Sequence, residues 1–133
     1  MERYSGLAVG LMLLGCTALM AQAPVVAGNH ETPLRPLAGA GNVGVSNAVL
    51  RDQPEVRALR VLVEANGTRI LHAHNDVKFH LFIPITGKMQ LNLEGLPSVD
   101  VAPWHPYYMK AGTTHGFHNA GSAPVEIMEV FIR

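Results

Sequence analysis

The chain has 133 residues, of which 48% are hydrophobic and 15% are charged. A chain of this length builds one hydrophobic core, so we expect a single globular domain. Ten basic and ten acidic residues give a formal net charge of zero, which provides no basic surface for nucleic acid or for an anionic membrane. The expected partner is therefore a small molecule or an ion.

The N-terminal residues are typical of a bacterial export signal. Arg3 precedes an apolar run over residues 7–20. A membrane-spanning helix needs roughly 20 apolar residues, and polar sequence follows this run at once, so we expect a cleaved signal peptide over residues 1–27. The cut can follow Ala23 or Ala27. Either cut predicts a periplasmic or secreted protein.

Two other interpretations of the N-terminus remain open. Leu13-Leu14-Gly15-Cys16 resembles a bacterial lipobox, and lipidation of Cys16 would anchor a periplasmic lipoprotein to the membrane. The run can also remain uncleaved as a helix packed on the domain. Because Cys16 is the only cysteine, the mature chain forms no internal disulfide and offers no pair of thiolates to a metal.

Residues 28–45 are rich in proline and glycine and show no apolar periodicity, so they predict a flexible N-terminal arm. The domain is expected over residues 46–133. Short β-type runs recur there, at residues 56–65, 68–74, 77–85, 88–93, 99–102, 106–110, 114–118 and 125–132.

Turn signals separate these runs, and Asn66-Gly67 is a strong hairpin signal. No run beyond residue 46 has a sustained helical period. About eight strands in ~85 residues must close on themselves or form two packed sheets to protect their edges. The prediction is an all-β fold of the jelly-roll or small-barrel kind.

Seven histidines are present, six of them between residues 72 and 118. His72 and His74 are two apart in a predicted strand, so both side chains project from the same face. If the next run is the antiparallel partner strand, His80 points at the same interior. Adjacent imidazoles in an apolar barrel would cost desolvation energy unless something bonds them, and neutral imidazoles suit iron, nickel, copper and zinc. These three histidines therefore predict a metal site, whereas His105 and His118, taken singly, are better read as hydrogen-bonded core residues.

Residues 67–119 resemble the two motifs of the cupin superfamily, G-x5-H-x-H-x3-4-E-x6-G and G-x5-P-x-G-x2-H-x3-N. The second is matched without a gap by residues 112–119, in which His115 is the histidine and Asn119 the asparagine, although Trp104 and Lys110 replace its earlier glycine and proline. In the first motif, Gly67 precedes His72 by one residue too few, and the glutamate is missing.

Two residues compete for the place of the missing glutamate. Six residues separate His80 from Gly87, as six separate the motif's glutamate from its glycine, whereas Lys78 is nearer the usual distance from His74. We expect His80, because a neutral imidazole binds metal better than an ammonium that must first lose its proton. A lysine in the third position would put metal binding in doubt.

The resemblance implies a double-stranded β-helix (jelly-roll) cupin barrel holding one divalent ion, Fe, Mn, Ni or Zn, on His72, His74, His80 and His115. It also implies a small-molecule ligand and allows a homodimer through an edge strand, for which residues 56–65 are the candidate.

Two functions follow. One is a metal-dependent enzyme, dioxygenase-like or lyase-like, acting on a small polar molecule, with Lys78, Tyr107, Tyr108 and Glu94 as candidate acid or base groups. The other is a non-catalytic module that binds a ligand or sequesters a metal in the periplasm. The phenylalanines are read as core residues with no role in the site, and Met89, Met109 and Met128 lie at core-like positions.

Overall fold

The computed structural model describes residues 32–133, and the expected signal peptide and Cys16 lie outside this part of the chain. Residues 32–133 contain no helix of the length and hydrophobicity that a membrane span requires. They form nine strands: β1 (Arg35–Pro36), β2 (Val43–Asp52), β3 (Val56–His72), β4 (Phe79–Pro84), β5 (Met89–Leu93), β6 (Val99–Val101), β7 (Tyr107–Lys110), β8 (His115–His118) and β9 (Val125–Ile132).

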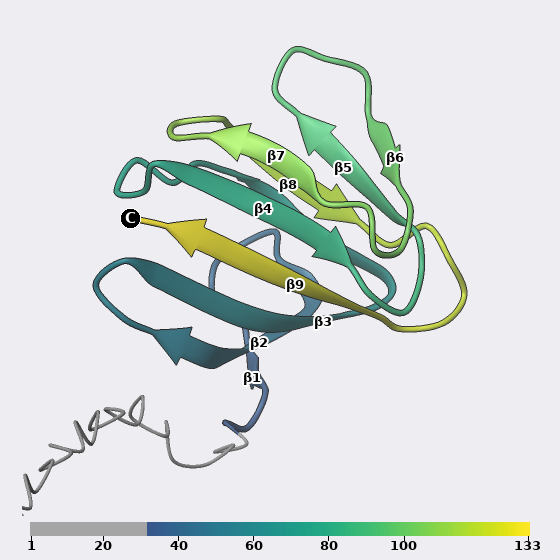
Figure 1. The fold of residues 1–133 in the computed structure, drawn as a ribbon. Coiled ribbons are helices and arrows are strands. Elements are labelled where there is room, and N and C mark those ends of the chain that lie inside the picture. The colour runs from purple at the N-terminus through teal and green to yellow at the C-terminus, as the bar shows by residue number, and fades with distance from the viewer. Residues whose placement is uncertain (1–31) are drawn as a thin grey trace, which may run out of the picture.

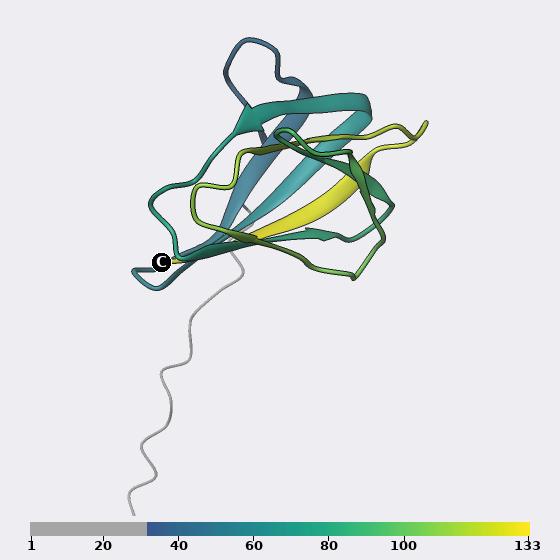
Figure 2. The same ribbon diagram turned by 90° about the horizontal axis from the view of Figure 1, so that it is seen from above.

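All strand pairs are antiparallel and belong to one sheet of order β6-β5-β8-β3-β9-β4-β7, with β2 added to β3 and β1 to β2. The sheet folds over itself into a nearly closed barrel (Figure 1, Figure 2). One layer holds β2, β9, β4 and β7, and the facing layer holds β8, β5 and β6. The prediction of an all-β jelly roll is confirmed.

Strand β3 belongs to both layers. Its residues 56–63 pair with β9, and residues 68–72 pair with β8. Between these segments Asn66 adopts a left-handed φ of 62°, and a Cβ on Gly67 would come within 2.8 Å of a backbone oxygen. Asn tolerates left-handed backbone better than most residues, so the chain bends here without ending the strand. The prediction of a hairpin at Asn66-Gly67 is wrong.

The same pairing corrects two further expectations. Residues 56–63 lie between β2 and β9, so this segment is not an edge strand. At the N-terminal side, β1 and the beginning of β2 fall within residues 28–45, and Arg35 pairs with Asn47. The sheet therefore begins at Arg35 rather than near Ser46, because backbone pairing with β2 orders a segment that has no apolar periodicity.

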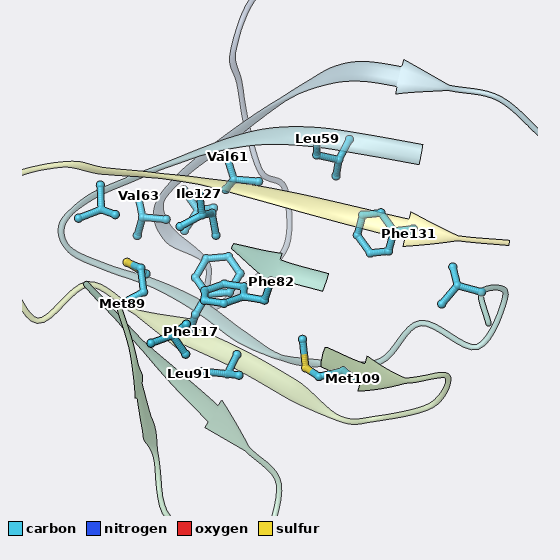
Figure 3. Packing of buried hydrophobic residues seen from close by; sticks show 14 residues of the cluster. Leu59, Val61, Val63, Phe82, Met89, Leu91, Met109, Phe117, Ile127 and Phe131 are labelled. Carbon is cyan, nitrogen blue, oxygen red and sulfur yellow. The ribbon is translucent and has the colours of Figure 1, made fainter. Parts of the chain in front are cut away.

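The core fills the space between the layers (Figure 3). Phe82 and Phe117 pack at its middle with ring centroids 5.3 Å apart. Val61 and Ile127 contribute from β3 and β9, and Leu91 from β5 in the facing layer. Phe131 lies at one end of this cluster, where the barrel interior changes from apolar side chains to histidines.

Candidate metal site

The four predicted histidines come together at one end of the barrel. His72 is the last residue of β3 and is paired with His115, the first residue of β8. His80 lies in β4, and His74 lies two residues beyond β3 rather than within a strand. Ring centroids are 4.5 Å apart for His72 and His115, and 5.0 Å apart for His80 and His115. His74 lies 4.9 Å from His72 and 5.3 Å from His80.

Gly116 allows β8 to approach β3 closely beside these histidines. A Cβ at this position would lie 2.5 Å from the backbone oxygen of Arg69 and 3.0 Å from the carbonyl carbon of Ile70. The register between β3 and β8 shifts between Arg69 and His72 at the same place. Because Gly116 has no side chain, the irregular end of β3 can lie close to β8, with His72 opposite His115.

Backbone carbonyls orient two of the imidazoles. Nδ1 of His72 donates to the carbonyl oxygen of Ile70 at 2.9 Å, and Nδ1 of His115 donates to that of Thr113, also at 2.9 Å. A carbonyl can only accept, so the hydrogen of each neutral ring is on Nδ1. The lone pair of each Nε2 is then available, which is the usual arrangement of a metal-binding histidine.

Several polar atoms of the cluster are buried without a partner. Nε2 of His74, Nε2 of His80, Nε2 of His115 and Oε1 of Glu129 have no hydrogen bond among the described residues. A buried polar group left unpaired is costly, and most are satisfied in native proteins. A cation bonded to these atoms would remove that cost.

Glu129 is a member of the cluster that the sequence interpretation missed. It lies in β9 and is only 6% exposed. Its Oε1 is 3.5 Å from Nε2 of His80. Two sets of potential ligands can be drawn, His72 with His74 and His115, and His80 with His115 and Glu129; the atoms of each set lie within 4.8 Å of one another. The described cluster therefore combines four imidazoles with one carboxylate.

The sequence does contain a signal for Glu129. In β9 the buried positions alternate, and Val125, Ile127, Glu129 and Phe131 share the face that points into the barrel. A carboxylate among three large apolar residues on that face breaks the pattern. Such a break indicates either a partner inside the barrel or a functional group.

Burial of the histidines, and the nearness of histidines to Glu129, keep these groups in the protonation states that a cation requires. Desolvation, with a smaller contribution from neighbouring histidines, lowers the pKa of His74 and of His115 to about 4. The pKa of His72 is also lowered, mainly by burial. Burial raises the pKa of Glu129, but the neighbouring His80, His115 and His72 outweigh it and lower the pKa below its ordinary value. These histidines are thus neutral near pH 7, and Glu129 is a carboxylate.

The other residues singled out in the sequence lie elsewhere. Lys78 is exposed and belongs to neither set of potential ligands. Tyr108 and Glu94 are exposed, Tyr107 packs against the apolar core, and none of these four residues lines the pocket at the histidines.

The two remaining described histidines take no part in the cluster. His105 is exposed in a loop, where its Nδ1 donates to the carbonyl oxygen of Pro103, so the core interpretation is wrong for this residue. His118 is half-buried and hydrogen-bonded to Thr68.

A pocket of about 250 Å³ opens beside the cluster and is bordered by His72, His74 and Glu129. Its apolar wall includes Phe117 and Phe131, which are also core residues, and His80 stacks on Phe131 at 4.4 Å between ring centroids. Its charged lining consists of Arg57, Arg69, Asp76, Glu129 and Arg133. The cluster is therefore reachable by a small molecule.

No protein-family model matches the chain, and no curated protein matches it in sequence. Solved structures do match, and they define the class of fold: the barrel is that of the cupins. An RmlC-like cupin from Shewanella frigidimarina superposes with a TM-score of 0.64 at 14% identity, over 80% of this chain and 87% of that one.

Two further similar structures have names that describe reactions. A predicted oxalate decarboxylase from Thermotoga maritima has a TM-score of 0.69 at 20% identity, over 81% of this chain and 98% of that one. The polyketide cyclase RemF from Streptomyces resistomycificus has a TM-score of 0.68 at 19% identity, over 80% of this chain and 77% of that one. At these identities the likeness establishes the cupin fold of this chain and leaves its reaction open.

Proposed function

We propose that this chain is an exported metal-dependent enzyme with a cupin fold, acting on a small polar molecule by a dioxygenase-like or lyase-like reaction. The observation that carries the proposal is that buried, unpartnered nitrogen and oxygen atoms gather at one end of the barrel, in two sets of potential ligands that share His115. One divalent ion would bond these atoms and remove their desolvation cost.

The proposed ligands are His72, His74, His80 and His115, with Glu129 adjacent. Nitrogen donors of this kind suit Fe, Ni or Zn, and the adjacent carboxylate suits Mn as well. When bound, the ion would act as a Lewis acid toward a substrate oxygen and lower the pKa of a bound water.

The protein's own residues prepare the site for such an ion. The carbonyl oxygens of Ile70 and Thr113 hold the rings of His72 and His115 with Nε2 free. Phe131 stacks on His80, whose ring is buried. The adjoining pocket would admit a small molecule beside the ligands. Enzymes named among proteins of the same fold, a cyclase and a predicted decarboxylase, support catalysis as the use of this barrel.

The number of potential donors favours a second candidate, a module that binds or sequesters a metal without turnover. Four imidazoles and a carboxylate supply five donor groups, whereas catalytic zinc sites commonly use three protein ligands and keep a position open. Water relaxation by the Mn(II)-loaded protein separates the candidates, because an open coordination position leaves fast-exchanging water on the ion and a saturated site does not.

Elemental analysis of untagged protein, purified gently from its native compartment, tests the metal itself. We expect one divalent ion per chain. His115→Ala should lose it, whereas His105→Ala, which changes an exposed histidine outside the cluster, should retain it. A content far below one per chain that added iron, manganese, nickel or zinc does not restore would contradict the proposal.

Export rests on the N-terminal sequence and is tested separately. Mass spectrometry of the protein from the periplasm or medium should give a mature chain that lacks the leader. A mass that begins at Met1 would contradict processing, and a lipid on Cys16 would identify the lipoprotein form.

A further inference from the structure

Three arginines line the pocket beside the histidine cluster, and two of them lie on the inner face of β3. Arg57 is paired with Phe131, and Arg69 is paired with Phe117. Directly opposite residues of antiparallel strands share a face, and both phenylalanines are buried in the core. The two arginines therefore occupy positions at which an apolar residue is expected.

The donor groups of these arginines are incompletely used. Arg133 donates to Asp52 Oδ1 at 2.8 Å and to the carbonyl oxygen of Gln53 at 3.0 Å. Nε of Arg57 is buried without a hydrogen bond and forms an ion pair with Asp52 Oδ2 at 3.8 Å. Arg69 makes no side-chain hydrogen bond or ion pair with any residue in the described part of the chain.

The charges around the pocket favour an anion once a divalent ion is bound. Three arginines face the carboxylates of Asp76 and Glu129, and Asp52, which lies outside the lining, pairs with Arg57 and Arg133, so these six side chains sum to zero. A divalent ion on the histidines would raise the sum to two positive charges. Guanidinium groups match planar carboxylates through two parallel hydrogen bonds, and a partly desolvated, unpaired guanidinium gains most from such a partner.

We propose that the ligand of this pocket is a small organic carboxylate, whose carboxylate group binds Arg69 with support from Arg57 while an oxygen at its other end faces the metal. This inference rests on the proposed metal site and specifies the class of its substrate. The apolar wall formed by Leu59, Val61 and Phe117 accommodates the carbon chain between the two ends. A volume of about 250 Å³ limits that chain to a few carbon atoms, because it is below the range of pockets for drug-sized ligands.

A carboxylate is favoured over a phosphate group at Arg69. The planar guanidinium matches a planar carboxylate through two parallel hydrogen bonds. The apolar wall of the pocket also contacts the carbon chain of an organic carboxylate, and inorganic phosphate has no such chain.

Calorimetric titration of the folded chain with defined probes tests the inference. Zn(II) is titrated into the metal-free protein. Succinate, the neutral isostere succinamide and inorganic phosphate are each titrated into the zinc-loaded and the metal-free protein. We expect succinate to bind the zinc-loaded protein at least tenfold more tightly than succinamide or phosphate does. Arg69→Gln should bind zinc as the parent does and lose succinate affinity by roughly tenfold or more, as expected for a charge-assisted pair.

Arg60→Gln is the matched control, since Arg60 lies on the same strand but faces outward and pairs with Glu126. It should retain both zinc and succinate. Unfolding midpoints report whether each variant is folded. If Arg69→Gln does not fold, the comparison of succinate with succinamide on the parent protein still tests whether the pocket prefers a carboxylate.

The outcomes separate this inference from the metal site. Succinate binding that is unchanged in folded Arg69→Gln, or that is no tighter than succinamide or phosphate binding, overturns the carboxylate pocket and leaves the metal proposal intact. If neither the parent nor the variants bind zinc, the metal site is wrong. In that case, succinate binding by the metal-free parent that is lost in Arg69→Gln supports the carboxylate pocket. The absence of such binding overturns the carboxylate pocket.

Discussion

Nε2 of His80 and Oε1 of Glu129 lie 3.5 Å apart inside the barrel, and neither atom has a hydrogen-bond partner among the described residues. The separation is too long for a hydrogen bond and suits two donors directed at one ion. Because His80 is in β4 and Glu129 in β9, which pair directly, the sheet itself holds the two groups side by side.

Glu129→Gln should weaken the binding of a divalent metal by roughly tenfold or more, since it removes a negative charge next to the ion while keeping the shape of the side chain. Competition titration against a chromophoric chelator measures the affinity. Glu126→Gln is the control, because it changes a carboxylate of the same strand that points away from the barrel interior and pairs with Arg60. Equal affinities for Glu129→Gln and the parent would show that the carboxylate is not part of the metal site.

His80→Ala should reduce metal affinity by one to several orders of magnitude, at least the ~10-fold expected for loss of a supporting partner. Lys78→Ala should leave it nearly unchanged, because Lys78 is exposed outside the cluster. The same chelator competition compares the two. An affinity that survives in His80→Ala and falls in Lys78→Ala would mean that the first motif has been aligned in the wrong register.

The free energy of unfolding of the metal-free protein should fall as the pH is lowered from about 6.5 toward 4. The pKa values of His74 and His115 are about 4 in the folded chain and near 6.5 when unfolded, so the unfolded state binds more protons throughout this window. The slope should stay below about 1.4 kcal/mol per pH unit for each histidine, since solvent screens the half-buried His74.

Urea unfolding at several pH values measures this dependence, and His74→Asn should make it shallower. The lowered pKa of Glu129 acts with the same sign at lower pH, where protonation of its carboxylate removes a stabilising charge. A stability that stays constant from pH 6.5 to 4 would contradict the prediction.

Asn119→Ala should lower the free energy of unfolding by roughly 2–4 kcal/mol, because several buried hydrogen bonds are lost at once. The amide of Asn119 donates to the carbonyl oxygens of Val63, Glu64 and Ala123 at 2.8–3.1 Å and accepts from the backbone N–H of Gly121. Chemical denaturation measures the change.

The control for this substitution is Asn92→Ala. The side chain of Asn92 accepts one exposed hydrogen bond, from Ser98, so its removal should change stability little. Similar losses in the two variants would show that the network around Asn119 does not stabilise the fold.

Much of the barrel could be predicted because the alternation of apolar and polar residues along a strand indicates which side chains are buried. The run at residues 125–132 coincides with β9, and the runs at 88–93 and 99–102 differ from β5 and β6 by one residue at an end. The spacing of His72 and His74 predicted a shared interior, although His74 reaches it from the connection after β3. The second cupin motif placed His115 because its pattern is unbroken.

The remaining features depend on contacts that local sequence does not encode. Asn66-Gly67 specifies a left-handed residue, but whether the chain then reverses or bends depends on which strands are available to pair on both sides. Arg57 and Arg69 look like outward-facing strand residues until the pairing with Phe131 and Phe117 fixes their face. Glu129 corresponds to no position of the two motifs and is far in sequence from the histidines, because this carboxylate comes from the last strand.

The bend at Asn66 also sets the distance between two arginine side chains. Arg57 lies before it and Arg69 after it, and both side chains reach the same pocket. The angle between the two halves of β3 therefore fixes the spacing of the two guanidinium groups. In this barrel the backbone conformation of one residue therefore determines whether both guanidinium groups can reach a single carboxylate. Substitutions that alter the bend should weaken carboxylate binding even though they change no residue that contacts the ligand.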